Sequence, residues 1–142
     1  MKLAHARIVT NDVPGLTRFY QAVTGITPHG DDRYVEFHAP ALTLAISSQT
    51  TIDRHSARAT TPAANRSVIL DFEVEDVDEE RVRLQPIVQE FVLEPTTQPW
   101  GNRSMLFRDP DGNLINVFAD VRTGAKARGH ARESIVGAQH GE

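Results

Sequence analysis

Apolar and polar residues alternate with two different periods along this chain, and the two periods follow one another in a repeated order. Residues 3–9 (LAHARIV) and 67–75 (SVILDFEVE) show the two-residue period of strands. Each is followed by an Asp-Val pair that begins a helical pattern, at Asp12 and at Asp76. The chain therefore predicts the same strand-then-helix start twice, 64 residues apart.

The first helical pattern has clear start and stop signals. Asp12 suits an N-cap and Pro14 suits the first turn, whereas Gly25 suits the end. The apolar residues between them recur at the spacing of one helix face, and they are Leu16, Phe19, Tyr20 and Val23. The second helix is predicted from Asp76 to about Gln85, where Pro86 ends it.

Further strands follow each helix. They are predicted at residues 34–38 (YVEFH), 42–46 (LTLAI), 88–93, 103–108 and 113–118, and the last two are joined by an Asp-Pro-Asp-Gly turn. Residues 47–66 are small and polar without periodicity, so they are predicted to be a linker. Residues 123–142 form a tail rich in Gly, Ala and charge, which by composition alone is typical of disorder.

The two halves thus predict an α+β fold of two tandem βαβββ modules. The expected single domain spans residues 1–122, with modules at 1–47 and 67–119 and a linker at 48–66. In each module the helix covers one face of the sheet and leaves the other face open. One module is too small to be stable alone, so we expect the two to pair and their open faces to form a cleft.

Composition narrows the functional classes. The chain has 142 residues, a formal net charge of −4, a pI near 5.8 and no cysteine. The acidic balance argues against a nucleic-acid partner, and the missing cysteines exclude disulfides and thiolate sites. The sequence has no run of about 20 apolar residues that could span a membrane and no signal-peptide pattern, so we expect a cytoplasmic protein.

Two stretches, TRFYQAVTGI and PWGNRSMLFRDPDGNLINVF, resemble the glyoxalase/bleomycin-resistance/dioxygenase superfamily, whose members are also called vicinal oxygen chelate proteins. The resemblance covers about residues 1–120 and is most specific from Pro99 to Phe118. It implies a curled sheet around a cleft and a homodimer. It does not fix the function, since the superfamily includes lyases, dioxygenases, epimerases and proteins that only sequester drugs.

The resemblance also implies where a divalent cation would bind. Metal-dependent members use cleft-facing side chains of the first and last strand of each module, and here these positions are His5, Ile46, Ile69 and Asn116. Two are aliphatic, and an Asn amide is a weak donor. We therefore predict that the protein uses no metal and no other cofactor, provided that the strand register is correct.

Alternation predicts what the cleft contains instead. Arg7 and Val9 would share the face of His5. In the second module, Asp71 and Glu73 would share the face of Ile69, and Leu114 and Phe118 would share the face of Asn116. The opposite face would be uniformly apolar, with Val68, Leu70, Phe72, Val74, Ile115 and Val117. The predicted ligand-binding residues are His5, Arg7, Asp71, Glu73, Asn116 and Trp100, the last as a stacking surface for a planar ligand.

Each of these residues also has a structural explanation. His5 could be a satisfied remnant of the family pattern, Arg7 and Asp71 could pair with each other, and Glu73 could be solvated. Asn116 could fix a turn or a neighbouring backbone group, and Trp100 could cover the core or a dimer interface. We interpret Asp109, Asp111 and Gly112 as turn residues. His38 and Glu36 share a strand face and could belong to a displaced site, whereas His29 and His55 are predicted in loops.

The leading hypothesis is a metal-free protein of the bleomycin-resistance type that sequesters an aromatic or polyfunctional small molecule in a dimeric cleft. The alternative is a lyase, isomerase or dioxygenase with a non-standard metal site or with acid–base catalysis by Asp71, Glu73 and His5. A third possibility is a regulatory module whose tail binds a protein.

Overall fold

The computed structural model describes residues 1–121, and these residues form two compact units. Unit 1 comprises Met1–Val68 and Asp109–Asn113. Unit 2 comprises Ile69–Arg108 and the described residues from Leu114 onward. The tail predicted at residues 123–142 lies outside the described residues.

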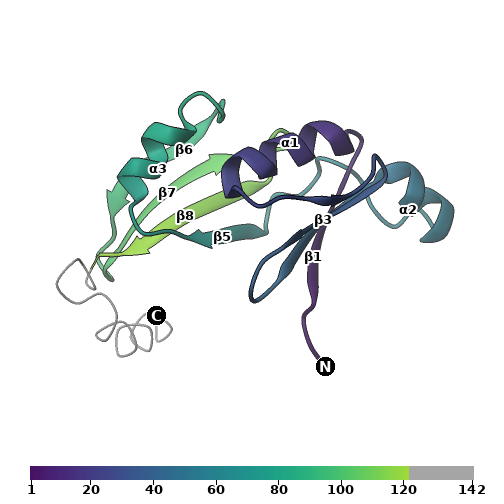
Figure 1. The fold of residues 1–142 in the computed structure, drawn as a ribbon, viewed down its shortest axis with the longest axis horizontal. Helices are drawn as coiled ribbons and strands as arrows, with labels where there is room; N and C mark the ends of the chain where they lie inside the picture. The colour runs from purple at the N-terminus through teal and green to yellow at the C-terminus, as the bar shows by residue number, and fades with distance from the viewer. Residues whose placement is uncertain (122–142) are drawn as a thin grey trace. The chain divides into compact units, whose positions relative to one another are not determined.

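Unit 1 is built on a four-stranded sheet, here named sheet A, with the strand order β1-β4-β3-β2. The edge strand β1 pairs with β4 in parallel, and the other neighbours are antiparallel. In chain order the elements are β1 (His5–Thr10), α1 (Val13–Thr24), β2 (His29–Gly30), β3 (Tyr34–His38), β4 (Thr43–Ser48) and α2 (Gln49–His55), as drawn in Figure 1.

Unit 2 repeats this plan in sheet B, with the strand order β5-β8-β7-β6. Its elements are β5 (Ile69–Glu73), α3 (Val77–Leu84), β6 (Phe91–Thr97), β7 (Asn102–Arg108) and β8 (Leu114–Asp120). Figure 1 shows α3 beside β6, which it contacts. The predicted α+β fold of two tandem βαβββ modules is therefore confirmed.

The start and end of α1 follow the predicted signals. The Asp12 side chain accepts a hydrogen bond from the Gly15 amide at 3.0 Å, and Gly25 adopts a left-handed φ of 73° beyond the last turn. The buried face of α1 carries the predicted apolar residues together with Val13. This face packs on Val35, Phe37, Leu44 and Ile46 of sheet A, which are all buried. The core of unit 1 thus lies between α1 and one face of its sheet.

Unit 2 has its core on the α3 side of sheet B. Met105 pairs with Val117, and Phe107 pairs with Ile115, so these four buried side chains share one face. Asp76 begins α3 by accepting a hydrogen bond from the Glu79 amide at 3.1 Å. Leu70 and Phe72 join the same face through β8, as predicted.

The turn between β7 and β8 is organised by Asp109, whose carboxylate accepts four hydrogen bonds. Its Oδ1 accepts from the amides of Asp111 at 2.9 Å and Asn113 at 2.8 Å. Its Oδ2 accepts from the Asn113 side chain at 2.8 Å and from the Tyr20 hydroxyl at 2.6 Å. The predicted turn role of Asp109 is confirmed, and the residue additionally anchors the turn to α1 within unit 1.

Some local predictions differ from the structure. The segment 47–66 contains helix α2, because Ser48 caps it through the Thr51 amide and Ile52 buries its single large apolar side chain. His29 lies in the short strand β2, and His55 ends α2, so neither lies in a loop. Val68 precedes β5 and is 57% exposed, so its assignment to the apolar face was wrong. β6 begins at Phe91, because the amide of the buried Val88 still bonds to the Leu84 carbonyl of α3.

Candidate functional site

The open face of sheet A, on the side opposite α1, carries three rows of side chains. The strand register places His5, Thr43 and His38 in one row, and Arg7, Ala45 and Glu36 in the next. Val9, Ser47 and Tyr34 form the third row. Residues paired in register point to the same side of a sheet. The predicted placement of His5, Arg7 and Val9 on one face is therefore confirmed.

The register corrects one sequence assignment. Ile46 pairs with Ile8 and is completely buried on the α1 side, so it does not share the face of His5. The residue of β4 that occupies the position of Asn116 in β8 is Ala45, because Arg7 pairs with Ala45 as Asp71 pairs with Asn116. The predicted position was wrong by one residue, since LTLAISS offers no polar alternation to fix its register.

Glu36 lies at the centre of a polar cluster on this face. Its Oε2 accepts a hydrogen bond from the Tyr34 hydroxyl at 2.6 Å and lies 3.5 Å from the His5 Nε2. Its Oε1 lies 3.3 Å from the His38 Nε2. Strand β4 separates β1 from β3 in the sheet, so the contact between His5 and Glu36 crosses above β4. Ala45, in the same row, is 0% exposed.

Tyr34 completes this cluster as a hydrogen-bond donor. The hydrogen bond to Glu36 is the main cause that raises the pKa of the Tyr34 hydroxyl above its ordinary value, and partial burial adds to it. The hydroxyl therefore stays protonated at neutral pH and holds the carboxylate in place. Sequence alternation placed Glu36 and His38 on one strand face. Nothing in the sequence indicated that His5 and His38 would both contact the Glu36 carboxylate, or that Tyr34 would join them.

The open face of sheet B carries two carboxylates of β5, and Arg108 of β7 shares this face through its pairing with Leu114. Ile69, Asp71 and Glu73 of β5 pair with Leu114, Asn116 and Phe118 of β8, as the predicted alternation requires. The Asn116 Nδ2 donates a hydrogen bond to the Asp71 Oδ1 at 2.9 Å. Asn116 therefore fixes a neighbouring side chain rather than a turn or a backbone group. The pairing of Arg7 with Asp71 would join the two units, and it stays a prediction.

Trp100 lies in the turn between β6 and β7 and is 45% exposed. The turn is closed by the Gly101 amide, which donates to the Gln98 carbonyl at 3.0 Å. An exposed indole can stack on a planar molecule. Stacking of Trp100 on a ligand stays a prediction, as does the cleft between the two open faces.

The side chains present do not suit the divalent cation of metal-dependent relatives. The four corresponding positions are His5 and Ala45 in unit 1 and Ile69 and Asn116 in unit 2. One imidazole is the only strong donor, and it contacts Glu36. His5 and His38 approach different oxygens of that carboxylate, and within residues 1–121 no three His, Asp or Glu side chains are grouped as an ion would require.

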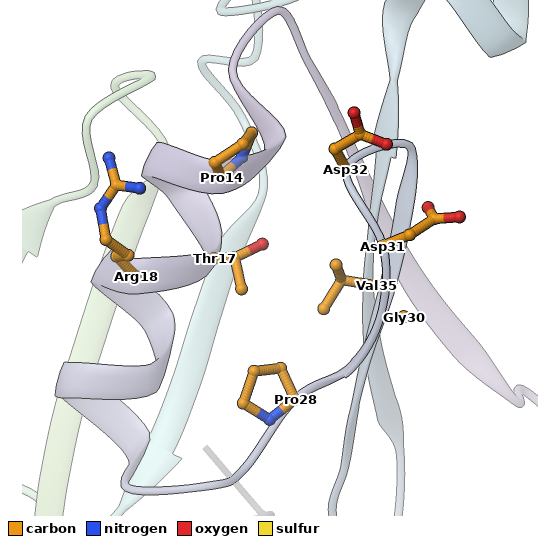
Figure 2. Close-up of a pocket in the computed structure, with 8 residues that line it drawn as sticks. All are labelled: Pro14, Thr17, Arg18, Pro28, Gly30, Asp31, Asp32 and Val35. Atoms are coloured by element: carbon orange, nitrogen blue, oxygen red, sulfur yellow. The ribbon is translucent and has the colours of Figure 1, made fainter.

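A separate cavity of about 300 Å³ lies on the α1 side of unit 1 (Figure 2). It is lined by Pro14, Thr17 and Arg18 of α1 and by Pro28, Gly30, Asp31, Asp32 and Val35. Figure 2 shows the Thr17 and Val35 side chains facing each other across it. The Thr17 hydroxyl is buried and has no hydrogen-bond partner within residues 1–121. None of the predicted site residues lines this cavity, which makes it distinct from the open face.

The comparison with known proteins agrees with this geometry. The profile of the Glyoxalase/Bleomycin resistance protein/Dioxygenase superfamily matches residues 2–117. The chain belongs to this superfamily. No curated protein matches the sequence significantly.

Solved structures of superfamily proteins share the fold. A glyoxalase/bleomycin resistance protein/dioxygenase family enzyme from Burkholderia phytofirmans PsJN is 15% identical, with a TM-score of 0.74 over 84% of this chain and 99% of that chain. A glyoxalase/bleomycin resistance protein/dioxygenase from Nocardioides is 23% identical, with a TM-score of 0.72 over 87% of this chain and 86% of that chain. A lactoylglutathione lyase from Agrobacterium tumefaciens is 22% identical, with a TM-score of 0.62 over 85% and 95%.

Among the described residues, no helix has the length and apolar character needed to cross a bilayer.

Proposed function

We propose that this superfamily member binds a small organic molecule without a divalent metal at the family position, in the manner of bleomycin-resistance proteins that sequester their ligand. The observation that carries the proposal is the donor set of Ala45, Ile69, His5 and Asn116. A small or aliphatic side chain replaces a ligand in each module, and both remaining polar side chains contact a neighbouring carboxylate.

The open faces offer what such binding needs. Sheet A contributes imidazole, guanidinium and phenol groups, and sheet B contributes two carboxylates beside Ile69, which is 49% exposed. A few polar groups on an apolar wall are typical of small-molecule sites. We extend the proposal to a cytoplasmic homodimer in which the ligand contacts Arg7, Asp71, Glu73 and Trp100 in addition to His5 and Asn116.

The first test measures metal content. The full chain, purified without chelator and dialysed, is analysed for Mn, Fe, Co, Ni, Cu and Zn by mass spectrometry. We expect less than about 0.1 ion per chain. A stoichiometric ion that is lost in His5→Ala but retained in His55→Ala, a matched change at the end of α2, would overturn the proposal.

The second test measures binding. A panel of aromatic and polyfunctional compounds, including bleomycin, is screened by thermal shift, and each compound that shifts the melting temperature is titrated against Trp100 fluorescence. We expect saturable binding that is unchanged by EDTA. A panel without any saturable binder would contradict the proposed function. Sedimentation equilibrium tests the homodimer in the same preparation.

Metal-free acid–base catalysis is a second candidate, which the contact of His5 with Glu36 favours. A carboxylate that holds an imidazole is a common arrangement for general-base catalysis. Because the Agrobacterium relative is described as a lactoylglutathione lyase, the hemithioacetal of methylglyoxal and glutathione is the first substrate to test. Turnover that survives EDTA and is abolished in His5→Ala would support catalysis over sequestration.

A further inference from the structure

The cavity beside α1 is built entirely within unit 1 (Figure 2). Its volume is about 300 Å³. The residues that line it come from the first two turns of α1, from β2 with the segment on either side, and from β3. A dry apolar cavity of about 150 Å³ is enough to hold benzene. This cavity therefore has room for a ring with a short substituent.

The walls of the cavity are conformationally fixed. Pro14 and Pro28 hold their φ angles at about −65° through the pyrrolidine ring. Gly30 has a φ of 144°, and a Cβ there would lie 2.0 Å from the Tyr34 carbonyl oxygen, so glycine is needed for β2 to approach β3 this closely. Val35 is buried in the core against α1. A preformed cavity of this kind lowers the entropy cost of binding.

The interior of the cavity is apolar apart from one hydroxyl. Among the side chains that line it, Thr17 alone is polar and uncharged. Its Oγ1 is buried without a hydrogen-bond partner in the described part of the chain, although the residue as a whole is partly exposed. The hydroxyl and the methyl group share one Cβ, so rotation to another staggered rotamer can turn the hydroxyl toward a molecule in the cavity. A buried polar group without a partner calls for an explanation, and a ligand supplies one.

The charged side chains at the rim are directed elsewhere. In Figure 2 the charged ends of Arg18, Asp31 and Asp32 point away from the cavity. The Asp31 Oδ1 accepts hydrogen bonds from the amides of Arg33 at 2.8 Å and Tyr34 at 3.1 Å, so it closes the turn between β2 and β3. A charged ligand group would have to leave water without an opposite charge inside the cavity, which is costly. The interior therefore favours an uncharged molecule.

We infer that this cavity is a second binding site, separate from the open faces, for a compact uncharged molecule that carries an apolar ring and one hydrogen-bond acceptor such as a carbonyl oxygen. The ring packs against Pro14, Pro28 and Val35, and the Thr17 hydroxyl donates to the carbonyl oxygen. The inference goes beyond the proposed function, because no residue assigned to that function lines this cavity.

The experiment compares four probes that share a phenyl ring. Acetophenone carries a neutral carbonyl group, toluene lacks it, and benzoate and benzylamine carry a negative and a positive charge. Each probe is titrated into the ¹⁵N-labelled full chain, and the shifts of the backbone amides locate the bound probe. We expect acetophenone to bind with a Kd on the order of 1 mM, with its largest shifts at residues 15–18 and 29–35. Benzoate and benzylamine should bind at least about tenfold more weakly.

Substitutions at Thr17 test the assigned contact. Thr17→Val keeps the shape and removes the hydroxyl, so the ratio of acetophenone affinity to toluene affinity should fall about three- to tenfold. Thr17→Leu extends the side chain into the cavity and should weaken the binding of both probes by more than about tenfold.

Thr24→Val is the matched control at the end of the same helix. The Thr24 hydroxyl donates to the Tyr20 carbonyl at 2.7 Å, and Thr24 does not line the cavity, so the affinity ratio should stay unchanged. Circular dichroism checks that each variant is folded. If Thr17→Leu does not fold, the affinity ratio in Thr17→Val and the map of amide shifts still decide the result.

Three outcomes overturn the inference. Amide shifts centred on an open face, or no binding of acetophenone and toluene, would remove the site. An affinity ratio that Thr17→Val leaves unchanged would remove the hydroxyl from it. Benzylamine that binds most tightly, and loses this advantage in Asp32→Asn, would make the rim a site for a cation. The proposed function is unaffected by these outcomes, because it is tested by metal content and by the compound panel.

Discussion

The hydrogen bond between Tyr20 and Asp109 gives the sharpest prediction about stability. Tyr20 is 0% exposed and Asp109 is 5% exposed, and their oxygens are 2.6 Å apart. Burial, followed by the neighbouring Asp109, raises the pKa of the Tyr20 hydroxyl far above its ordinary value, so the hydroxyl remains a donor at every pH at which the protein is handled.

The magnitudes follow from the bonds that each substitution removes. Tyr20→Phe removes one donor, and Asp109 Oδ2 keeps its bond from the Asn113 side chain. We expect this variant to lose about 1.5 kcal/mol of unfolding free energy, as for a hydrogen bond to a charged group. Asp109→Ala removes all four bonds and leaves the Tyr20 hydroxyl buried without a partner, so we expect a loss of about 4 kcal/mol.

A double-mutant cycle isolates the pair. In Asp109→Ala the Tyr20 hydroxyl is buried without a partner, and Tyr20→Phe removes that hydroxyl. The double variant Tyr20→Phe/Asp109→Ala should therefore lose about 1–2 kcal/mol less unfolding free energy than the sum of the losses in the two single variants. Urea unfolding followed by far-ultraviolet circular dichroism gives each free energy, with unchanged m-values as the check on two-state behaviour.

Tyr34→Phe is the matched control for this cycle. Its hydroxyl also donates to a carboxylate at 2.6 Å, but Glu36 is only partly buried. We expect a loss below about 1 kcal/mol, since water replaces the partner of an accessible group. Additive single changes at Tyr20 and Asp109, or an equal loss in Tyr34→Phe, would refute the reasoning that burial sets the strength of these bonds.

Three further predictions concern single positions. Thr17→Val should raise the unfolding free energy, measured by urea unfolding, by about 0.5–1 kcal/mol, because it removes a buried hydroxyl that has no hydrogen-bond partner within residues 1–121. A variant that loses more than about 1 kcal/mol of unfolding free energy would show that the Thr17 hydroxyl does make a hydrogen bond. Gly30→Ala should destabilise the protein by more than about 2 kcal/mol in the same assay, because a Cβ at Gly30 would lie 2.0 Å from the Tyr34 carbonyl oxygen. Gly25→Ala should cost about 1 kcal/mol, because a Cβ there meets nothing within 4 Å. Equal losses in the two variants would contradict the predicted clash at Gly30. Arg103 lowers the pKa of Asp78, so the stabilisation from this pair is present above the unfolded carboxyl pKa of about 3.9 and is lost as the pH falls through the lower folded value. Arg103→Gln should therefore reduce the acid dependence of the melting temperature between about pH 5 and 3. An unchanged dependence would show that the exposed pair contributes nothing to stability.

The sequence predicted the fold well where two independent signals agreed. Capping by Asp12, together with apolar periodicity, predicted α1, and the start at Asp76 with the stop at Pro86 predicted α3. The Asp-Pro-Asp-Gly turn fixed β7 and β8, and strict alternation fixed the faces of β5. Helix α2 was missed because a short helix with one buried apolar residue produces almost no periodic signal.

The candidate site was predicted only in part, for a physical reason. Alternation assigns a residue to a face, so His5, Arg7, Asp71 and Asn116 were placed correctly on theirs. Contacts across non-neighbouring strands depend on side-chain reach and register, which a single sequence does not contain. Only the structure therefore identifies Glu36 as the centre of the cluster. The observed pairing of Arg7 with Ala45 likewise shows that Ala45, and not Ile46, occupies the family position in β4.

The contact of His5 with Glu36 above Ala45 limits which side chains position 45 can hold. A carboxylate at position 45 would enter a site that is 0% exposed, and it would bring a second negative charge close to Glu36. An engineered metal site with a carboxylate at position 45 would therefore first require removal of the Glu36 charge.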